Sequence, residues 1–259
     1  MHPVFLKLGD FTIAMYGVMV AIGFALGLWL AGRRAARERI SPEQINNLGV
    51  WLIVAGMLGG KLFYIVFFWS DFIGGWREEG IRSLREGFVF YGGFIGAALA
   101  GWFYTRTNKL PFLKLADIFA PSVALGHAFG RLGCFFNGCC YGKACDLPWA
   151  VKFPPPHVMH NIPVHPTQLY EVAGNLAIFT GLMLYHRHRR FRGQVWWFYM
   201  LAYGALRFAV EFFRGDYEHH YLGIFTLGHL IAAALILIAL TGHELSCRAG
   251  RPSQKQAAT

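Results

Sequence analysis

Residues 11–32 read FTIAMYGVMVAIGFALGLWLAG, a run of 22 residues that contains no charged side chain. A helix needs about 20 mostly apolar residues to cross a hydrocarbon core of about 30 Å, and this run has that length. Four arginines follow closely, at positions 33, 34, 37 and 39. Basic residues favour the cytoplasmic side, and no cleavage signal is present, so we expect a permanent helix whose N-terminus lies outside.

Similar apolar runs recur along the chain. Of the 259 residues, 55% are hydrophobic and only 15% are charged, whereas soluble domains have about 25% charged residues. We therefore predict an all-α polytopic membrane protein with a single domain over 1–249 and a short polar cytoplasmic tail over 250–259. The seven predicted transmembrane spans are 11–32, 48–69, 88–105, 112–133, 166–186, 194–213 and 223–242.

The distribution of basic residues indicates the orientation. Lys and Arg are about twice as frequent in the segments predicted inside as in those predicted outside, which favours an outer N-terminus and a cytoplasmic C-terminus. Of the outer segments, 70–87 is expected to form a short interfacial helix, and 134–165 is expected to be extended around its three consecutive prolines. The net charge of +10 comes from short, separate clusters, so it does not indicate nucleic-acid binding.

Ionisable side chains are rare inside membrane spans and are functional candidates there. Several polar side chains fall within about six residues, or roughly 9 Å, of the outer ends of different predicted spans. They are Tyr16, Tyr91, Arg131, Glu171, Arg207, Glu211 and His229. Lys61 lies slightly deeper. The pattern predicts one polar layer in the outer half of the membrane.

The sixth predicted span places Arg207, Glu211 and Arg214 on one helical stripe, at i, i+4 and i+7. A local ladder of ion pairs among these three side chains would explain Glu211. It would leave one positive charge unbalanced, because two arginines face one glutamate. Arg131 and Lys61 enlarge that surplus. A positive cavity favours an anion, and phosphate matches the planar donors of arginine, so we favour an anion site over a purely structural ladder.

Two further motifs contribute to this layer. Tyr91 opens YGGFIG, whose glycines allow another helix or a lipid to approach the backbone closely. In HPTQLYE, at 165–171, Gln168 and Glu171 share one helix face and can join the polar layer. Near the inner side, Asp117 is expected to pair with Lys114.

Four cysteines, Cys134, Cys139, Cys140 and Cys145, have the spacing C-x4-C-C-x4-C. Zinc sites usually separate two close pairs, and this cluster lacks that separation. Disulfides persist on the oxidising side of the membrane, so we favour one or two structural disulfides, with three pairings open. A zinc site and a thiol activated by the nearby arginine are the alternatives. No metal or cofactor is predicted.

The stretch GRLGCFFNG, at 130–138, resembles the signature of bacterial prolipoprotein diacylglyceryl transferases, which is close to G-R-x-G-N-F-x-N-G-E. The resemblance covers most of the chain, because further motifs follow the order of that family. They are YG at 16–17, GGK at 59–61, FYGGFIG at 90–96, HPTQLYE at 165–171 and LRFAVEFFR at 206–214. The family fold is a seven-helix bundle with an outer N-terminus and a cytoplasmic C-terminus.

The resemblance implies transfer of the diacylglyceryl group of phosphatidylglycerol to the lipobox cysteine thiol of a prolipoprotein, forming a thioether and releasing glycerol phosphate. It implies the bacterial cytoplasmic (inner) membrane, a site open to the outer leaflet, and no cofactor. Its partners would be phosphatidylglycerol, signal peptides with a lipobox cysteine, and membrane lipids. Arg131 and Arg207 would bind phosphate. The supporting lipid-site residues would be Tyr16, Asn137, Gly142, Glu211 and Arg214, with Lys61, Gln168 and Glu171 as further candidates for substrate binding.

The sequence departs from the family pattern at three positions. Cys134 replaces an asparagine, Cys139 replaces a glutamate, and Tyr91 replaces a histidine that many members carry. If that histidine takes the thiol proton, Tyr91 or His127 would have to lie near the thiol instead. His127 lies four residues before Arg131 on the same helix face, and an ordinary core histidine is the equal alternative.

Two other functions use the same bundle. One is a cysteine-based redox or metal-binding membrane protein. The other is a transporter for an anionic lipid or solute, which the lack of a broken-helix inverted repeat disfavours.

Overall fold

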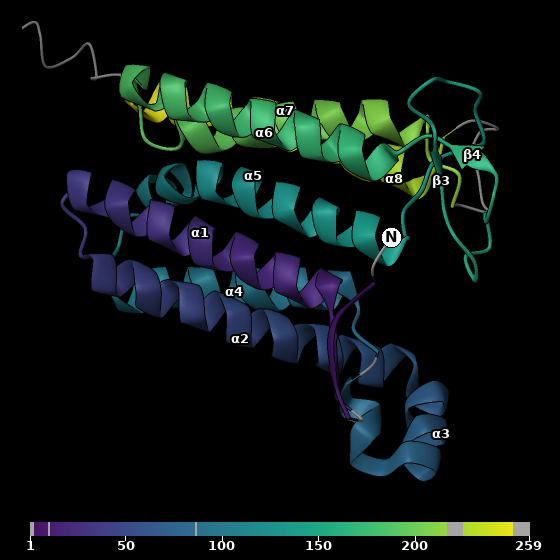
Figure 1. Ribbon diagram of the computed structural model, residues 1–259. Coiled ribbons are helices and arrows are strands. Elements are labelled where there is room, and N and C mark those ends of the chain that lie inside the picture. Colours follow the sequence, from purple (N-terminus) through teal and green to yellow (C-terminus); the bar gives the residue numbers. More distant parts are fainter. Residues whose placement is uncertain (1–2, 10, 86, 217–224, 251–259) are drawn as a thin grey trace, which may run out of the picture. The chain divides into compact units, whose positions relative to one another are not determined.

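A computed structural model describes residues 3–9, 11–85, 87–216 and 225–250 (Figure 1). Within these residues the chain is mainly helical, which confirms the predicted class. The helices are α1 (Met15–Arg37), α2 (Pro42–Phe67), α3 (Trp69–Glu79), η1 (Gly80–Arg85), α4 (Phe90–Thr107), α5 (Phe112–Asn137), α6 (Thr167–Tyr185), η2 (His186–His188), α7 (Gln194–Glu211) and α8 (Leu227–Gly250). Two small antiparallel sheets pair β1 (Val4–Leu8) with β2 (Phe11–Ala14), and β3 (Val151–Lys152) with β4 (Pro163–Val164).

Each predicted span coincides with one long helix. Among the described helices, four are long and apolar enough to cross a membrane, namely α1, α2, α5 and α8. Helices α4, α6 and α7 have 18 or 19 residues and reach about 27 Å, slightly less than the hydrocarbon core. The count of seven spans and the orientation of the termini stay predictions. The helix expected within 70–87 is confirmed as α3 with η1.

Several predicted boundaries were wrong. Residues 11–14 form strand β2, because they pair with β1 instead of continuing α1. Helix α5 continues through 134–137 and ends before Gly138, whose φ of 80° leaves the right-handed helical region. Helix α8 continues eight residues past the predicted end at 242. The predicted start of that span at 223–224 and the tail over 251–259 lie outside the described residues.

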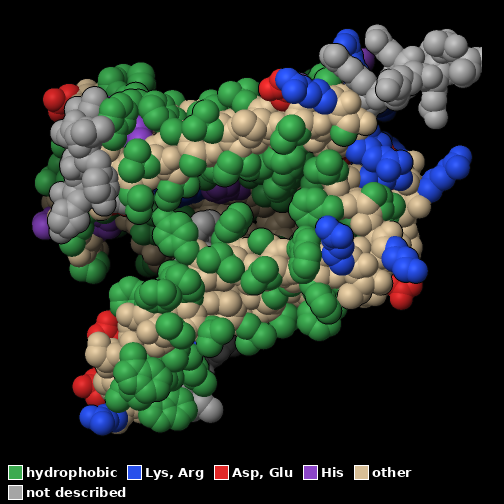
Figure 2. All heavy atoms as spheres, turned by 180° about the vertical axis from the view of Figure 1, so that it is seen from behind, with side chains coloured by type: hydrophobic (Ala, Val, Ile, Leu, Met, Phe, Trp, Pro, Cys, Tyr) green, Lys and Arg blue, Asp and Glu red, His purple; other side chains and the backbone are tan. Residues whose placement is uncertain are grey.

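The surface of α2 is strongly apolar. Its large exposed hydrophobic side chains include Val50, Trp51, Met57, Leu58, Leu62 and Val66. Figure 2 shows hydrophobic side chains over much of the visible surface of the long helices. Water-soluble monomers rarely expose contiguous apolar patches of this kind, whereas hydrocarbon solvates them. The surface therefore fits a multi-pass membrane protein.

The chain packs as two compact units, Ala31–Leu115 and the remainder, Met1–Leu30 with Ala116–Thr259. In the second of these, α5, α6 and α7 share a core in which Ala120, Leu182 and Val195 are buried. Its α1 segment also approaches α5 closely, since a Cβ atom on Gly23 would lie 3.1 Å from the Gly126 carbonyl oxygen. A single domain over 1–249 stays a prediction.

In the unit Ala31–Leu115, helices α2 and α4 pack through glycines. A Cβ atom on Gly59 would lie 2.5 Å from the Gly92 carbonyl oxygen, and one on Gly96 would strike the Ala55 carbonyl oxygen. The YGGFIG motif was expected to admit either a helix or a lipid. In the structure the close partner is helix α2.

Replacing Gly92 by alanine is expected to lower the thermal unfolding midpoint of the purified protein. The new methyl group would overlap Phe63 and the Gly59 carbonyl, and overpacking of this kind costs about 1–3 kcal/mol. Gly74→Ala is the matched control, because its Cβ atom would meet open space. Equal midpoints for the two variants in the same detergent would contradict this packing.

Candidate functional site

The centre of the candidate site is the carboxylate of Glu171 on α6, which is buried. Arg207 on α7 donates from Nη1 to Glu171 Oε1 over 3.0 Å. Arg131 on α5 places Nε 2.8 Å from Glu171 Oε2, an ion pair by distance that lacks hydrogen-bond alignment. One carboxylate therefore joins two arginines from two other helices. The structure brings together three residues that the sequence predicted as one layer.

Arg207 also contacts a second carboxylate, one turn further along α7. Its Nη2 lies 2.6 Å from Glu211 Oε2, and the Thr226 hydroxyl donates to Glu211 Oε1 over 2.5 Å. The Thr226 backbone N–H in turn donates to His229 Nδ1 over 3.1 Å. Glu211, Thr226 and His229 are all buried. The planar fork of Arg207 is thus held between two buried carboxylates.

The charges at this cluster balance more closely than the sequence suggested. Glu171 and Glu211 match Arg131 and Arg207, and Arg214 makes a two-pronged contact with Asp216 at 2.8 and 2.5 Å. The surplus of positive charge predicted from the sequence had included neither Glu171 nor Asp216. A guanidinium has five N–H donors, and the Glu171 contact uses only Nε of Arg131. The carboxylates position the arginines, and Arg131 keeps Nη donors for other acceptors.

Tyr203 is a site residue that sequence reasoning missed. The charge of Arg131 acts on its hydroxyl, and its ring centre lies 4.7 Å from that of His127. The available signal was its position four residues before Arg207 on the same helix face. His127 itself lies in the cluster, with Nε2 3.8 Å from Glu171 Oε2. Its two predicted roles, as a base and as a packed histidine, stay predictions.

Gly142 joins three segments beside Arg214. Its backbone N–H donates to the His165 carbonyl over 3.0 Å, and the next residue, Lys143, donates to the Phe213 carbonyl over 2.8 Å. A Cβ atom on Gly142 would lie 2.6 Å from the His165 oxygen and 2.7 Å from the Phe213 oxygen. Only glycine fits there, and the approach places the loop after α5 against the end of α7.

Gln168 contacts the cysteine loop. Its Nε2 donates to the Cys139 carbonyl over 2.8 Å, and the neighbouring Thr167 hydroxyl donates to the Cys140 carbonyl over 2.7 Å. Asn137 is the exposed last residue of α5, two residues before Cys139. Gln168 and Thr167 therefore support the loop that follows α5.

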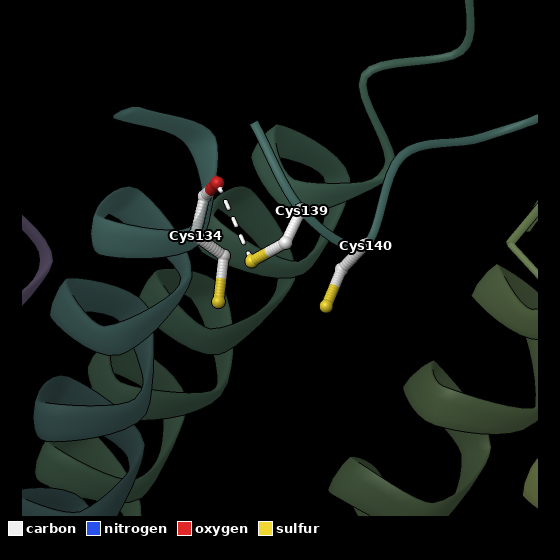
Figure 3. A group of neighbouring side chains, drawn as sticks. All are labelled: Cys134, Cys139 and Cys140. Carbon is white, nitrogen blue, oxygen red and sulfur yellow. Dashed lines mark hydrogen bonds between the residues drawn. The ribbon is translucent and has the colours of Figure 1, made fainter. Parts of the chain in front are cut away.

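The sulfur atoms of Cys134, Cys139 and Cys140 lie within 4.8 Å of one another, and Figure 3 shows the three side chains pointing into a common space. Cys145 is not part of this cluster. All five cysteines, including Cys247, are free thiols in the structure, so a disulfide stays a prediction. The neighbouring thiols of Cys134 and Cys139 lower the pKa of the Cys140 thiol, and the charges of Arg214 and Arg131 lower it further.

The remaining predicted residues lie elsewhere. Tyr16 packs on α5, since a Cβ atom on Gly133 would lie 3.0 Å from the Tyr16 ring. Lys61 and Tyr91 belong to the other unit. There Lys61 donates to the Ser83 carbonyl over 3.1 Å, and Tyr91 is 48% exposed at the start of α4.

The predicted pair of Asp117 with Lys114 was wrong. Asp117 is fully buried and accepts backbone hydrogen bonds from Gly193 and Trp196, over 2.7 and 3.0 Å. A carboxylate at a helix N-terminus satisfies unpaired N–H groups and complements the helix dipole. Lys114 instead donates to the Glu38 carbonyl over 2.6 Å. Capping of α7 outweighed a contact between near neighbours in sequence.

A family model described as prolipoprotein diacylglyceryl transferase matches residues 3–243 of the chain. The chain belongs to the prolipoprotein diacylglyceryl transferase family. It is 38% identical to the phosphatidylglycerol–prolipoprotein diacylglyceryl transferase of Clostridium tetani over 83% of this chain and 86% of that protein. The enzymes of the same name from Geobacter sulfurreducens and Pseudoalteromonas atlantica are 36% and 35% identical, over 92% and 91% of this chain and 93% and 85% of theirs.

Membership of this transferase family confirms the resemblance seen in the sequence motifs. It does not favour a redox or metal-binding protein as the overall function. The residues of the Arg131, Glu171 and Arg207 cluster all lie within the matched range.

Proposed function

We propose that this chain transfers the diacylglyceryl group of phosphatidylglycerol to the lipobox cysteine thiol of prolipoproteins. The names of its relatives state both substrates, and the chain aligns with them over most of its length. The observation that carries the proposal is the pair of arginines, Arg131 and Arg207, held by the buried carboxylate of Glu171. Such a pair presents planar donors to a phosphodiester within an apolar helical bundle.

The geometry suits displacement at the glycerol carbon of the lipid. The substrate sulfur forms the new S–C bond, the C–O bond to phosphate breaks, and its electron pair leaves with glycerol phosphate. Negative charge therefore grows on the phosphate oxygens in the transition state. Donors of Arg131 and Arg207 that are already oriented stabilise this charge without reorganising. The surrounding lipid site is proposed to be shaped by Asn137, Gly142, Arg214, Gln168 and Tyr16. Lys61 stays a sequence-based candidate for substrate binding.

We propose that one of two residues, His127 or Tyr91, accepts the thiol proton. His127 lies at the arginine cluster, with Nε2 3.8 Å from Glu171 Oε2. Tyr91 is half exposed at the start of α4. A proton acceptor must reach the thiol directly or through one water. Replacing His127 and Tyr91 one at a time should therefore show which residue accepts the proton, because loss of the acceptor lowers kcat.

We further propose seven transmembrane spans, an outer N-terminus and a cytoplasmic C-terminus, in the bacterial inner membrane. The apolar helices and the bias of basic residues support this topology. The site would then open towards the outer leaflet, where phosphatidylglycerol and a lipobox signal peptide can meet.

Mass spectrometry of a lipobox peptide incubated with the purified protein and phosphatidylglycerol tests the function. We expect the peptide to gain the mass of a diacylglyceryl group. A peptide with serine in place of the lipobox cysteine is the control and should gain none. A folded protein that leaves the cysteine peptide unmodified, or full activity of Arg131→Ala, would reject the proposal.

Gly228→Ala is expected to lower the transfer rate about tenfold to 100-fold, because the added methyl group would strike the Glu211 carboxylate and shift Arg207. Gly181→Ala is the control, because its Cβ atom would meet open space on α6. Rates of the two variants that agree within error would show that Glu211 does not position Arg207.

A further inference from the structure

The three clustered thiols are brought together by a reversal of the chain after α5. The helix ends at Asn137, and Gly138 adopts φ of 80°. The backbone N–H groups of Gly138 and Cys139 then donate to the Cys134 carbonyl, over 2.9 and 3.2 Å. As a result, Cys139 and Cys140 return to the end of the helix that carries Cys134 (Figure 3).

Buried contacts hold this reversal in place. Thr167 and Gln168, each only 1% exposed, donate to the Cys140 and Cys139 carbonyls. Cys140 itself adopts φ of 63°, a region that glycine enters without strain and residues with a Cβ atom avoid. A cysteine that occupies a position better suited to glycine is expected where its side chain has a function.

We propose that Cys134, Cys139 and Cys140 form a binding site for a thiophilic divalent metal ion such as Zn²⁺. Thiolates are the ligands that soft metal ions prefer. Zn–S bonds are about 2.3 Å long, so three sulfurs of a tetrahedral site lie about 3.8 Å apart. The observed sulfurs, within 4.8 Å of one another, have to close by about 1 Å at most, which side-chain rotation can supply.

The local charge suits such a site. Three thiolates and one divalent cation carry a net charge of −1, and the guanidinium groups of Arg131 and Arg214 act electrostatically on this cluster. Three protein ligands leave one tetrahedral position open, which is the arrangement of catalytic rather than structural zinc sites.

The open position gives the site a role that rests on the proposed function. The lipobox thiol of the substrate would bind there as a thiolate and release its proton to the acceptor proposed above, because metal coordination favours deprotonation of a thiol. The metal-bound sulfur forms the S–C bond, and the C–O bond to phosphate breaks with its electron pair leaving on glycerol phosphate. The product thioether is neutral and binds the metal weakly, so the open position is restored.

Cobalt binding to the full-length protein, purified under reducing conditions, tests the metal site directly. We expect one Co²⁺ per chain and a thiolate-to-cobalt charge-transfer band. Cys134→Ser, Cys139→Ser and Cys140→Ser should each weaken binding about tenfold or more. Cys145→Ser is the matched control, because this cysteine lies in the same loop but outside the cluster, and it should bind like the wild type.

Three results would overturn the site. The first is binding well below one Co²⁺ per chain. The second is an equal loss of binding in Cys145→Ser. The third is an intact mass two hydrogens lower than that of the thiol form, with no metal bound, which would show a disulfide instead.

The open position is tested by adding a lipobox peptide to the cobalt-loaded protein without lipid. The cysteine peptide should intensify the charge-transfer band, and a peptide with serine in its place should not. This readout needs no turnover. A protein that binds cobalt and the peptide thiol but forms no thioether would therefore reject the proposed function and keep the site. Full transfer activity in Cys134→Ser, Cys139→Ser and Cys140→Ser would reject the metal's role and keep the function.

Discussion

Replacing Arg207 by lysine is expected to lower kcat/KM for diacylglyceryl transfer about 100-fold or more, although the positive charge is kept. The guanidinium of Arg207 bridges two buried carboxylates, at 3.0 Å from Glu171 and 2.6 Å from Glu211. A lysine ammonium is a single point of charge and cannot contact both while also facing a phosphate. Initial rates with a lipobox peptide and phosphatidylglycerol measure the effect.

The matched control for this prediction is Arg248→Lys. Arg248 also pairs with a glutamate four residues away on its own helix, Glu244, but that pair is exposed on α8. Its replacement should leave kcat/KM unchanged. The thermal unfolding midpoint of both variants shows whether a lost rate reflects lost folding. Near wild-type kcat/KM in a folded Arg207→Lys protein would remove Arg207 from the proposed phosphate site.

Replacing Glu171 by glutamine is expected to destabilise the protein by about 3 kcal/mol. The substitution keeps the volume of the side chain but removes the charge that pairs with Arg131 and Arg207 in a buried position. The guanidinium groups would then lose the one carboxylate that both contact. Reversible unfolding in mild detergent, followed by circular dichroism, measures the change in unfolding free energy.

Glu244→Gln serves as the control, because its exposed pair with Arg248 should contribute less than about 1 kcal/mol. We also expect Glu171→Gln to lower the transfer rate, since Glu171 orients both arginines. Unfolding free energies of the two glutamine variants that agree within about 0.5 kcal/mol would contradict the central position of Glu171.

The helices were predictable because the physical requirement is local. A run of about 20 apolar residues indicates a spanning helix wherever it occurs, and each predicted span coincides with a helix. The ends were less predictable. Phe11–Ala14 is apolar enough to continue α1, and only its pairing with Val4–Leu8 makes it a strand. The α5 end depended in the same way on the backbone conformation of Gly138.

The site was partly predictable, for a different reason. A charged side chain within an apolar helix is costly, so Arg131, Glu171 and Arg207 stood out as candidates before any contact was known. Their pairing across α5, α6 and α7 could not be read from spacing. The ladder within one helix, which the sequence analysis kept as the alternative to an anion site, is only partly present: Arg207 pairs with Glu211, but Arg214 contacts Asp216.

The sequence by itself determined the apolar helices, the motifs of the transferase family and the polar residues that apolar spans do not tolerate without a function. Each of these depends on composition within a short window or on the order of short motifs. Only the tertiary structure decided which charges pair, and that Cys134, Cys139 and Cys140 converge while Cys145 does not. Such contacts depend on backbone reversals and helix packing, which bring together groups whose separation along the chain carries no information about their distance in space.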